Sequence, residues 1–210
     1  MLEAPLRLYA DTQFASPYAM SVFVALREKQ LAFELFAVDL GSGANREESY
    51  AVESLTQRVP TLAHGDFALS ESSAITEYLD DTFPETLVYP RDRHLRARAR
   101  QVQAWLRSDL LPIRQERSTE VVFYKNEAPA LTAAAELAVE KLYFAADRLL
   151  PQDASNLFGD WCIADTDLAL MLNRLVMNGD DVPAKLASYA ARQWERASVQ
   201  QWVKLDRPPL

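Results

Sequence analysis

In the N-terminal part of the chain, short apolar stretches suited to strands alternate with longer stretches that have helical spacing. Pro17 suits the first position of a helix, and apolar residues recur at helical spacing from Tyr18 to Lys29. His64-Gly65-Asp66 separates two short strand patterns and predicts a hairpin. The other expected elements are strands at Leu6–Ala10, Phe33–Val38, Thr61–Ala63 and Phe67–Leu69, a weak helix at Asn45–Leu55, and a helix at Ser72–Phe83. This alternation predicts a sheet that is parallel in part and has an antiparallel hairpin at its edge.

The pattern changes after Pro84, where "PETLVYPRD" forms a proline-bounded linker. Beyond it the apolar spacing is helical throughout. The expected helices lie at about Arg93–Glu116, Leu131–Leu150, Asp165–Met177 and Pro183–Leu205. The pattern therefore predicts an α/β domain with the order βαβαββα at residues 1–83, a linker at 84–91 and an all-α domain at 92–210.

Composition excludes several classes of function. A net charge of −8 disfavours binding to nucleic acid, which depends on neutralising phosphates. No apolar run approaches the roughly 18 residues of a membrane span, and Met1 to Leu8 lacks the apolar core of a secretory signal. One cysteine and two histidines, far apart in sequence, make a dedicated metal site improbable. A single cysteine fits a reducing compartment, so we expect a cytoplasmic protein that binds neither metal, membrane nor nucleic acid.

Four short motifs occur in a characteristic order. They are Ser16-Pro17-Tyr18 before the first helix, Val59-Pro60 before the hairpin, Glu71-Ser72-Ser73-Ala74-Ile75 at the third helix, and Ile163-Ala164-Asp165 at a helix of the second domain. With the domain layout, they resemble the cytosolic glutathione transferase family over nearly the whole chain. The phrases "LSESSAI", "QAWLRSDL" and "WCIADTDLAL" are most similar to its YfcF-like bacterial group. The resemblance implies a thioredoxin-like N-terminal domain, glutathione as cosubstrate and a homodimer.

The Val59-Pro60 dipeptide has two interpretations. In the family, the proline at this position follows a cis bond, and the backbone N–H and C=O of the residue before it pair with glutathione as an added strand would. The alternative is a plain turn proline at the entrance of a strand.

Glu71 and Ser72 open a helix whose first N–H groups have no intrahelical partner and favour an anion. The resemblance implies that Ser72 and these N–H groups hold the γ-glutamyl carboxylate of glutathione, and that Glu71 holds its ammonium group. The alternative is ordinary helix capping by Ser72 or Ser73. The resemblance also makes Gln57 or Arg58 a weaker candidate for binding the glycyl carboxylate of glutathione.

Ser16 is the expected catalytic residue, as a hydrogen-bond donor that holds the glutathione sulfur as thiolate. A simple N-cap serine is the alternative interpretation, and Thr12 and Tyr18 are rival hydroxyl donors. Phe14, Tyr18 and Trp105 are candidates for the electrophile pocket, although core packing explains the aromatic residues equally well.

The expected function is a glutathione transferase whose thiolate attacks an electrophile or reduces organic peroxides. A glutathione-dependent disulfide reductase and a non-catalytic transferase-like binding module remain alternatives. Two other features have structural interpretations. Cys162 is expected to pack as a small buried residue beside the helix-opening Asp165, and the arginine-rich run Arg91–Arg100 is expected to form a solvated helix face.

Overall fold

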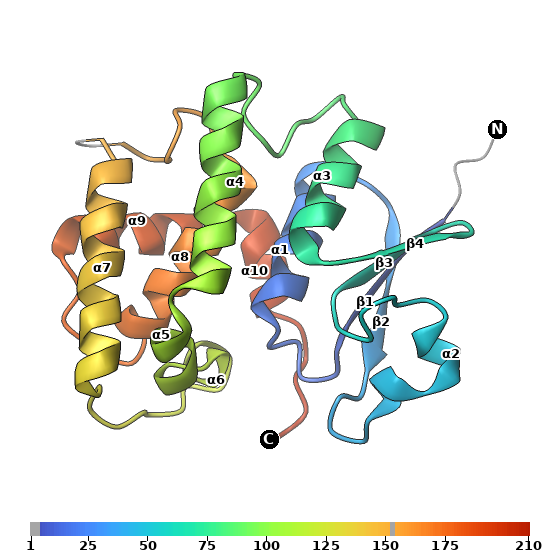
Figure 1. Cartoon of the computed structure of the whole chain (residues 1–210), viewed down its shortest axis with the longest axis horizontal. Coiled ribbons are helices and arrows are strands. Elements are labelled where there is room, and N and C mark those ends of the chain that lie inside the picture. Colours follow the sequence, from blue (N-terminus) through green and yellow to red (C-terminus); the bar gives the residue numbers. More distant parts are fainter. Residues whose placement is uncertain (1–4, 152–153) are drawn as a thin grey trace. The chain divides into compact units, whose positions relative to one another are not determined.

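The computed structural model describes residues 5–151 and 154–210. The prediction about a signal in Met1 to Leu8 therefore falls partly outside the described residues. The described chain forms two compact units: one runs to Val88 and also includes Gln201–Leu210, and the other is Tyr89–Gln200. Figure 1 shows strands only in the first unit and helices throughout the second. No helix in the described part of the chain is long and apolar enough to cross a membrane.

The first unit has the predicted order βαβαββα. Its elements are β1 (Leu6–Asp11), α1 (Pro17–Glu28), β2 (Phe33–Val38), a short 3₁₀ turn (Ala44–Arg46), α2 (Glu48–Ala51), β3 (Thr61–His64), β4 (Phe67–Ser70) and α3 (Ser72–Thr82). The weak helical pattern at Asn45–Leu55 thus corresponds to one 3₁₀ turn and one helical turn.

The four strands form one sheet in the order β2-β1-β3-β4. β1 runs parallel to β2 and antiparallel to β3, and β3 pairs with β4 in a hairpin. The predicted mixture of parallel and antiparallel pairing is confirmed. In Figure 1, α1 and α3 lie side by side on one side of this sheet and α2 lies on the other.

The last residues of the chain pack with the first unit instead of the helical one. The indole of Trp202, in α10 (Ala197–Val203), is fully buried and contacts the rings of Phe14 and Phe23 edge-on. The guanidinium of Arg207 donates to the Phe14 carbonyl at 3.1 Å. The first compact unit thus includes Gln201–Leu210, and the domain ranges 1–83, 84–91 and 92–210 stay a prediction.

The beginning of the predicted linker is bound to the first unit. Lys29 Nζ donates to Asp80 Oδ1 at 3.0 Å and also to the Thr86 carbonyl, and Val88 N–H donates to the same Asp80 oxygen at 2.7 Å. Because the side chains of Lys29 and Asp80 are almost completely buried, this ion pair is shielded from solvent and ions.

The helical unit contains more breaks than the sequence pattern predicts. Its elements are α4 (Arg93–Ser108), α5 (Leu111–Glu116), α6 (Thr119–Phe123), α7 (Ala133–Leu149), α8 (Ile163–Val176), α9 (Ala184–Trp194) and the first part of α10. The expected helix Arg93–Glu116 is interrupted at Asp109–Leu110 because Pro112 occupies the start of α5 and has no N–H for a preceding carbonyl. The expected helix Pro183–Leu205 ends at Trp194 and restarts at Ala197.

α8 is buried along most of its length, and its first turn is held by Asp165. The Asp165 carboxylate accepts hydrogen bonds from the Cys162 N–H at 2.9 Å, the Leu157 N–H at 2.7 Å and the Tyr189 hydroxyl at 2.8 Å. The carboxylate half of a capping box is therefore present although cysteine stands at the N-cap. The Cys162 side chain is buried, as the sequence predicts.

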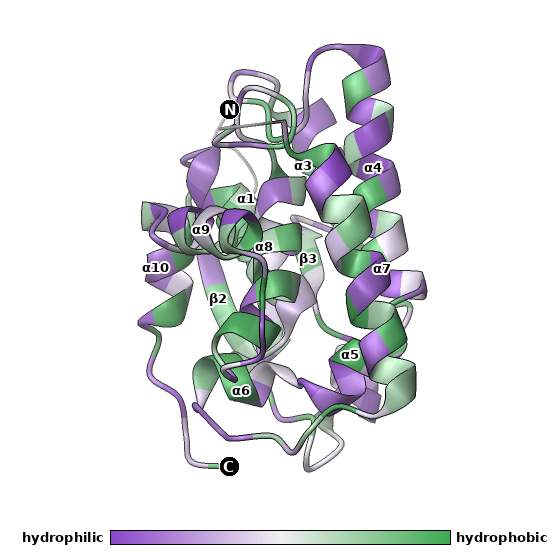
Figure 2. Cartoon of the chain, turned by 90° about the vertical axis from the view of Figure 1, so that its left-hand side faces the viewer, coloured by the Kyte–Doolittle hydropathy of each residue, from purple (hydrophilic) through white to green (hydrophobic). Residues whose placement is uncertain are grey.

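α4 carries the arginine-rich run. Figure 2 shows hydrophilic and hydrophobic positions alternating along this helix, and most of the residues from Arg91 to Arg100 are exposed. On its apolar stripe, Ala99, Val102 and Leu106 are buried, whereas Leu95 is 40% exposed. The solvated face is confirmed, and the stripe belongs to the core except at Leu95.

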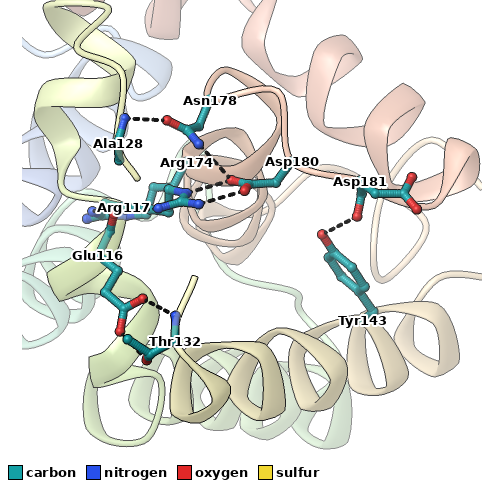
Figure 3. Close-up of polar contacts among 9 residues, drawn as sticks. All are labelled: Glu116, Arg117, Ala128, Thr132, Tyr143, Arg174, Asn178, Asp180 and Asp181. Carbon is teal, nitrogen blue, oxygen red and sulfur yellow. Dashed lines mark hydrogen bonds and ion pairs between the residues drawn. The ribbon is translucent and has the colours of Figure 1, made fainter. Parts of the chain in front are cut away.

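A buried ion pair ties the loop after α8 to the end of α5 (Figure 3). Arg117 donates from Nε and Nη2 to the two carboxylate oxygens of Asp180, at 2.6 and 2.7 Å. Arg174 donates to the Arg117 carbonyl at 2.7 Å, and Asn178 joins the network by donating to Asp180 at 3.3 Å. The sequence pattern identified this loop but gave no indication of its partner.

Candidate active site

The end of β1, the beginning of β3 and the end of β4 bring the predicted site segments to the same edge of the sheet, across the strand ends. Tyr9 in β1 pairs with Thr61 in β3, and Thr61 pairs with Ser70 in β4. The turn that carries Ser16 follows β1, Val59-Pro60 precedes β3, and Glu71-Ser72 follows β4. Because β1 and β4 are both antiparallel to β3, all three segments leave the sheet at the same edge.

The turn before Ser16 is built on Asp11, the last residue of β1. Its buried carboxylate accepts a hydrogen bond from the Ala15 N–H at 2.8 Å and another from the Ser16 N–H at 3.0 Å. The backbone of Ser16 is therefore fixed before the helix begins. Sequence reasoning did not include Asp11; an aspartate at the end of a strand, a few residues before a helix-opening serine, is the signal that was available.

Ser16 is the N-cap of α1, with Pro17 at the first helical position. Its hydroxyl oxygen accepts a hydrogen bond from the Ala19 N–H at 3.2 Å. This contact uses a lone pair of the oxygen and leaves the hydroxyl hydrogen available, and no acceptor for that hydrogen is found among the described residues. The capping interpretation is confirmed, and it is compatible with donation to a sulfur anion.

The two rival hydroxyls are placed differently. The Thr12 hydroxyl donates its hydrogen to Gln13 Oε1 at 3.1 Å. Tyr18 lies within α1, beyond the capping residue, and is half-buried. Ser16 is therefore the hydroxyl at the helix mouth whose hydrogen is not already used within the described chain.

The peptide bond between Val59 and Pro60 is cis, as the resemblance implies. Val59 is half-exposed, and no partner for its backbone N–H or C=O is found among residues 5–151 and 154–210. Gln57 and Arg58, which precede it, are both exposed. The Gln57 backbone is fixed by a 2.8 Å hydrogen bond from Asn45 Nδ2 to its carbonyl.

The start of α3 differs from the capping alternative. The N-cap residue is Glu71, not Ser72 or Ser73, and its side chain makes no capping hydrogen bond. Glu71 has φ 73° and ψ 113°, a backbone region that non-glycine residues avoid at a cost of about 1–3 kcal/mol. Its side chain is exposed, whereas Ser72 is buried. The first N–H groups of α3 therefore have no capping side chain, and an exposed carboxylate lies beside them.

The aromatic candidates for an electrophile pocket have different local surroundings. Phe14 is half-buried in the first unit, with φ 44° and its ring against Trp202. Trp105 lies in the helical unit, where its indole N–H donates to Asp109 Oδ2 at 2.8 Å. The pocket role of Phe14, Tyr18 and Trp105 stays a prediction. Within the described residues, no group of three or more His, Cys, Asp or Glu side chains is arranged to hold a metal ion.

Comparison with known proteins gives matches over both units. The family described as "Glutathione S-transferase, N-terminal domain" matches residues 14–87, and that described as "Glutathione S-transferase, C-terminal domain" matches residues 92–207. Glutathione S-transferase Z1 of Arabidopsis thaliana is 30% identical over 193 residues, which cover 89% of this chain and 86% of that protein. A glutathione transferase homolog from Burkholderia GL BGR1, solved with bound glutathione, is 52% identical with a TM-score of 0.80, covering 95% of this chain and 97% of that one. These matches confirm the thioredoxin-like domain followed by a helical domain.

Proposed function

Because the chain belongs to the glutathione S-transferase family, we propose that it binds glutathione at the sheet edge and activates its thiol as thiolate. The observation that carries this proposal is the convergence of Ser16, Val59 and Glu71-Ser72 at one edge of the sheet. Each offers a group that is unused within the described chain and complementary to one part of glutathione.

The peptide portion of glutathione would lie against the Val59 backbone and the start of α3. The N–H and C=O of Val59 would pair with the cysteinyl amide group, as in the addition of a strand. The N–H groups of the first turn of α3, with the Ser72 hydroxyl, would hold the γ-glutamyl carboxylate. Glu71 would hold the ammonium group, and Gln57 or Arg58 would reach the glycyl carboxylate.

Ser16 would act on the sulfur by donating its hydroxyl hydrogen. A free thiol has a pKa of about 8.5, so thiolate predominates at neutral pH only if that value falls by roughly two units, or about 2.7 kcal/mol. A hydrogen bond to an anion contributes about 1.5–3 kcal/mol, and a helix N-terminus adds about 0.3–1 kcal/mol. These two contributions suffice without a general base. The thiolate would then attack an electrophile or reduce an organic peroxide.

The alternatives have less support. A disulfide reductase commonly has a cysteine at the helix mouth, and here Ser16 stands there while the chain's one cysteine, Cys162, is buried in the helical unit. A non-catalytic binding module would have no need for a strained, exposed Glu71 at the start of α3. Membership of the YfcF-like group, homodimerisation and a cytoplasmic location are part of the same proposal, supported by the sequence resemblance.

Calorimetric titration with glutathione tests the binding site. Glu71→Ala should weaken glutathione binding by at least about tenfold, since it removes the partner of an ammonium group, equivalent to about 1.4 kcal/mol. Glu47→Ala is the matched control, because Glu47 is also an exposed N-cap residue without a side-chain capping bond. Absence of glutathione binding by the unmodified protein, or equal affinities in all three proteins, would contradict the proposal.

A further inference from the structure

Four buried hydroxyl groups meet beneath the segment that carries Val59 and Pro60. They belong to Tyr50 in α2, to Ser54 just after it, to Thr61 at the start of β3 and to Ser70 at the end of β4. We call these residues the hydroxyl cluster. Ser54 and Thr61 are completely buried and the other two nearly so, so that water cannot take over their hydrogen bonds.

Three hydroxyls of the cluster converge on one backbone oxygen, the carbonyl of Arg58. The Tyr50 hydroxyl lies 2.8 Å from this oxygen, the Thr61 hydroxyl 3.0 Å and the Ser54 hydroxyl 3.2 Å. A carbonyl oxygen has two lone pairs and each hydroxyl has one hydrogen, so two of these hydroxyls suffice to satisfy the carbonyl and the third can donate within the cluster. This carbonyl belongs to the peptide unit whose N–H is that of Val59. Holding the oxygen therefore sets the direction of the Val59 N–H, because the peptide unit is planar.

The same hydroxyls also reach the strand that leads to Glu71. Ser54 Oγ lies 3.1 Å from Ser70 Oγ, and Thr61 Oγ1 lies 2.8 Å from Ser54 Oγ and 3.4 Å from Ser70 Oγ. Ser70 is followed directly by Glu71. The cluster thus joins the residue before Val59 to the residue before Glu71, across 12 positions of sequence.

The surroundings keep Tyr50 in place as a donor. Its ring packs edge-on against the ring of Tyr9 in β1, with centroids 5.6 Å apart. A tyrosine hydroxyl ordinarily keeps its hydrogen at neutral pH, and burial raises the pKa of Tyr50 further. A hydrophobic residue at any position of the cluster would remove at least one of these buried hydrogen bonds, each of which contributes about 0.5–1.5 kcal/mol.

We propose that Tyr50, Ser54, Thr61 and Ser70 are positioning residues, which fix the backbone of Val59 relative to the start of α3 so that both ends of the peptide site match one ligand. This inference rests on the proposed function, since it concerns the same site. The cluster does not touch the ligand; it acts through the Arg58 carbonyl and through Ser70. Its loss should raise the Kd and KM for glutathione and leave the ionisation of the bound thiol unchanged, because Ser16 is held separately by Asp11.

The test compares Ser54→Ala with Ser21→Ala by calorimetry with glutathione. Both serines are buried in the first unit, at 0% and 1% exposure, but the Ser21 hydroxyl has no hydrogen-bond partner among the described residues. Ser54→Ala should raise the Kd about fivefold or more, equivalent to about 1 kcal/mol, and Ser21→Ala should change it by less than about twofold. Thr61→Val should behave like Ser54→Ala, and Thr61→Ser, which keeps the hydroxyl, should restore the affinity.

A second measurement separates positioning from folding and from the proposed function. Urea titration identifies the folded variants, and the backbone amide signals of Arg58 and Val59 in nuclear magnetic resonance spectra report the local geometry without ligand. We expect these two signals to shift in Ser54→Ala and Thr61→Val but not in Ser21→Ala. Unchanged Kd values in folded Ser54→Ala and Thr61→Val, or equal losses in Ser21→Ala, would overturn the inference. If the unmodified protein does not bind glutathione, the proposed function fails, and unshifted amide signals would still overturn the positioning role.

Discussion

Arg117 and Asp180 form a two-point ion pair inside the helical unit, with N–O distances of 2.6 and 2.7 Å and an Arg117 side chain that is only 1% exposed. Breaking such a pair from one side leaves a buried charge without a partner, which costs about 3–5 kcal/mol. Asp180→Ala should therefore lower the free energy of unfolding by about this amount, as measured by urea titration.

The control for this prediction is the ion pair between Lys185 and Asp147, in which the Asp147 side chain is 64% exposed. Exposed pairs contribute about 0–1 kcal/mol, so Asp147→Ala should have a small effect. Asp180→Asn, which keeps an acceptor oxygen, should fall between the two. If Asp180→Ala and Asp147→Ala unfold at the same urea concentration, the pair does not hold the unit together.

The backbone of Glu71 predicts a conflict between stability and binding. Glycine adopts positive φ without the strain of about 1–3 kcal/mol, but it also loses about 0.5–1 kcal/mol more chain entropy on folding. Glu71→Gly should therefore raise the free energy of unfolding by up to about 2.5 kcal/mol and at the same time weaken glutathione binding by about tenfold. Thermal and urea unfolding, together with calorimetry, measure the two effects.

Gln30→Gly provides the comparison, because Gln30 also has a positive φ, 56°, at the end of α1. It should increase stability with no change in the affinity for glutathione. A loss of stability in Glu71→Gly would show that the Glu71 side chain supports the fold instead of the ligand.

Cys162 predicts a pH dependence of stability. Burial, reinforced by the nearby Asp165 carboxylate, raises the pKa of the Cys162 thiol well above its usual range. The folded protein therefore keeps this proton at pH values where the unfolded chain, with a thiol pKa of about 8.5, releases it. The buried Cys162 thiol therefore makes its full contribution to the free energy of unfolding below about pH 8.5. Above that pH, the free energy of unfolding decreases by about 1.4 kcal/mol per pH unit.

Cys162→Ala should remove this slope between about pH 8.5 and 9.5 in urea titrations, below the range near pH 10 where the tyrosines of the unfolded chain ionise. In the native protein the thiol should also resist an aromatic disulfide reagent, and it should react fully once the protein is unfolded. Rapid reaction in the native state would contradict the structural role assigned to Cys162.

Sequence patterns predicted most of the fold because a helix or strand that is buried on one face has apolar residues at regular spacing. β2 occupies the predicted residues Phe33–Val38, and the cis bond at Val59-Pro60 agrees with the resemblance. The breaks after Ser108 and Trp194 were missed because the apolar spacing continues through both. Pro112 was the local signal for the first break.

The candidate site was only partly accessible to sequence reasoning. Ser16 and Glu71 lie in contiguous motifs, whereas Asp11 and the hydroxyl cluster act through contacts between segments. Thr61 and Ser70 meet only because of the β3–β4 register. Single polar residues in otherwise apolar or loop stretches carry no periodicity, so their partners become visible only in three dimensions. The positive φ of Glu71 likewise has no signature in residue type.

Ser16 is predicted to be both a helix cap and the donor to the sulfur. Ser16→Ala should lower the free energy of unfolding by about 1 kcal/mol, the usual effect of losing an N-cap side chain. Ser118→Ala, which removes the N-cap side chain of α6, is the matched control. Both variants lose a capping hydrogen bond, but only the first should alter the chemistry of bound glutathione.

The most direct test of the account is the ultraviolet absorbance of thiolate as a function of pH, recorded for glutathione bound to the unmodified protein, to Ser16→Ala and to Ser118→Ala. We predict that the unmodified protein and Ser118→Ala lower the pKa of the bound thiol by about two units from its free value near 8.5. In Ser16→Ala, the pKa of the bound thiol should return most of the way to the free value. Identical titrations in all three proteins would contradict the role of Ser16, and a bound thiol that titrates like free glutathione would contradict thiolate activation altogether.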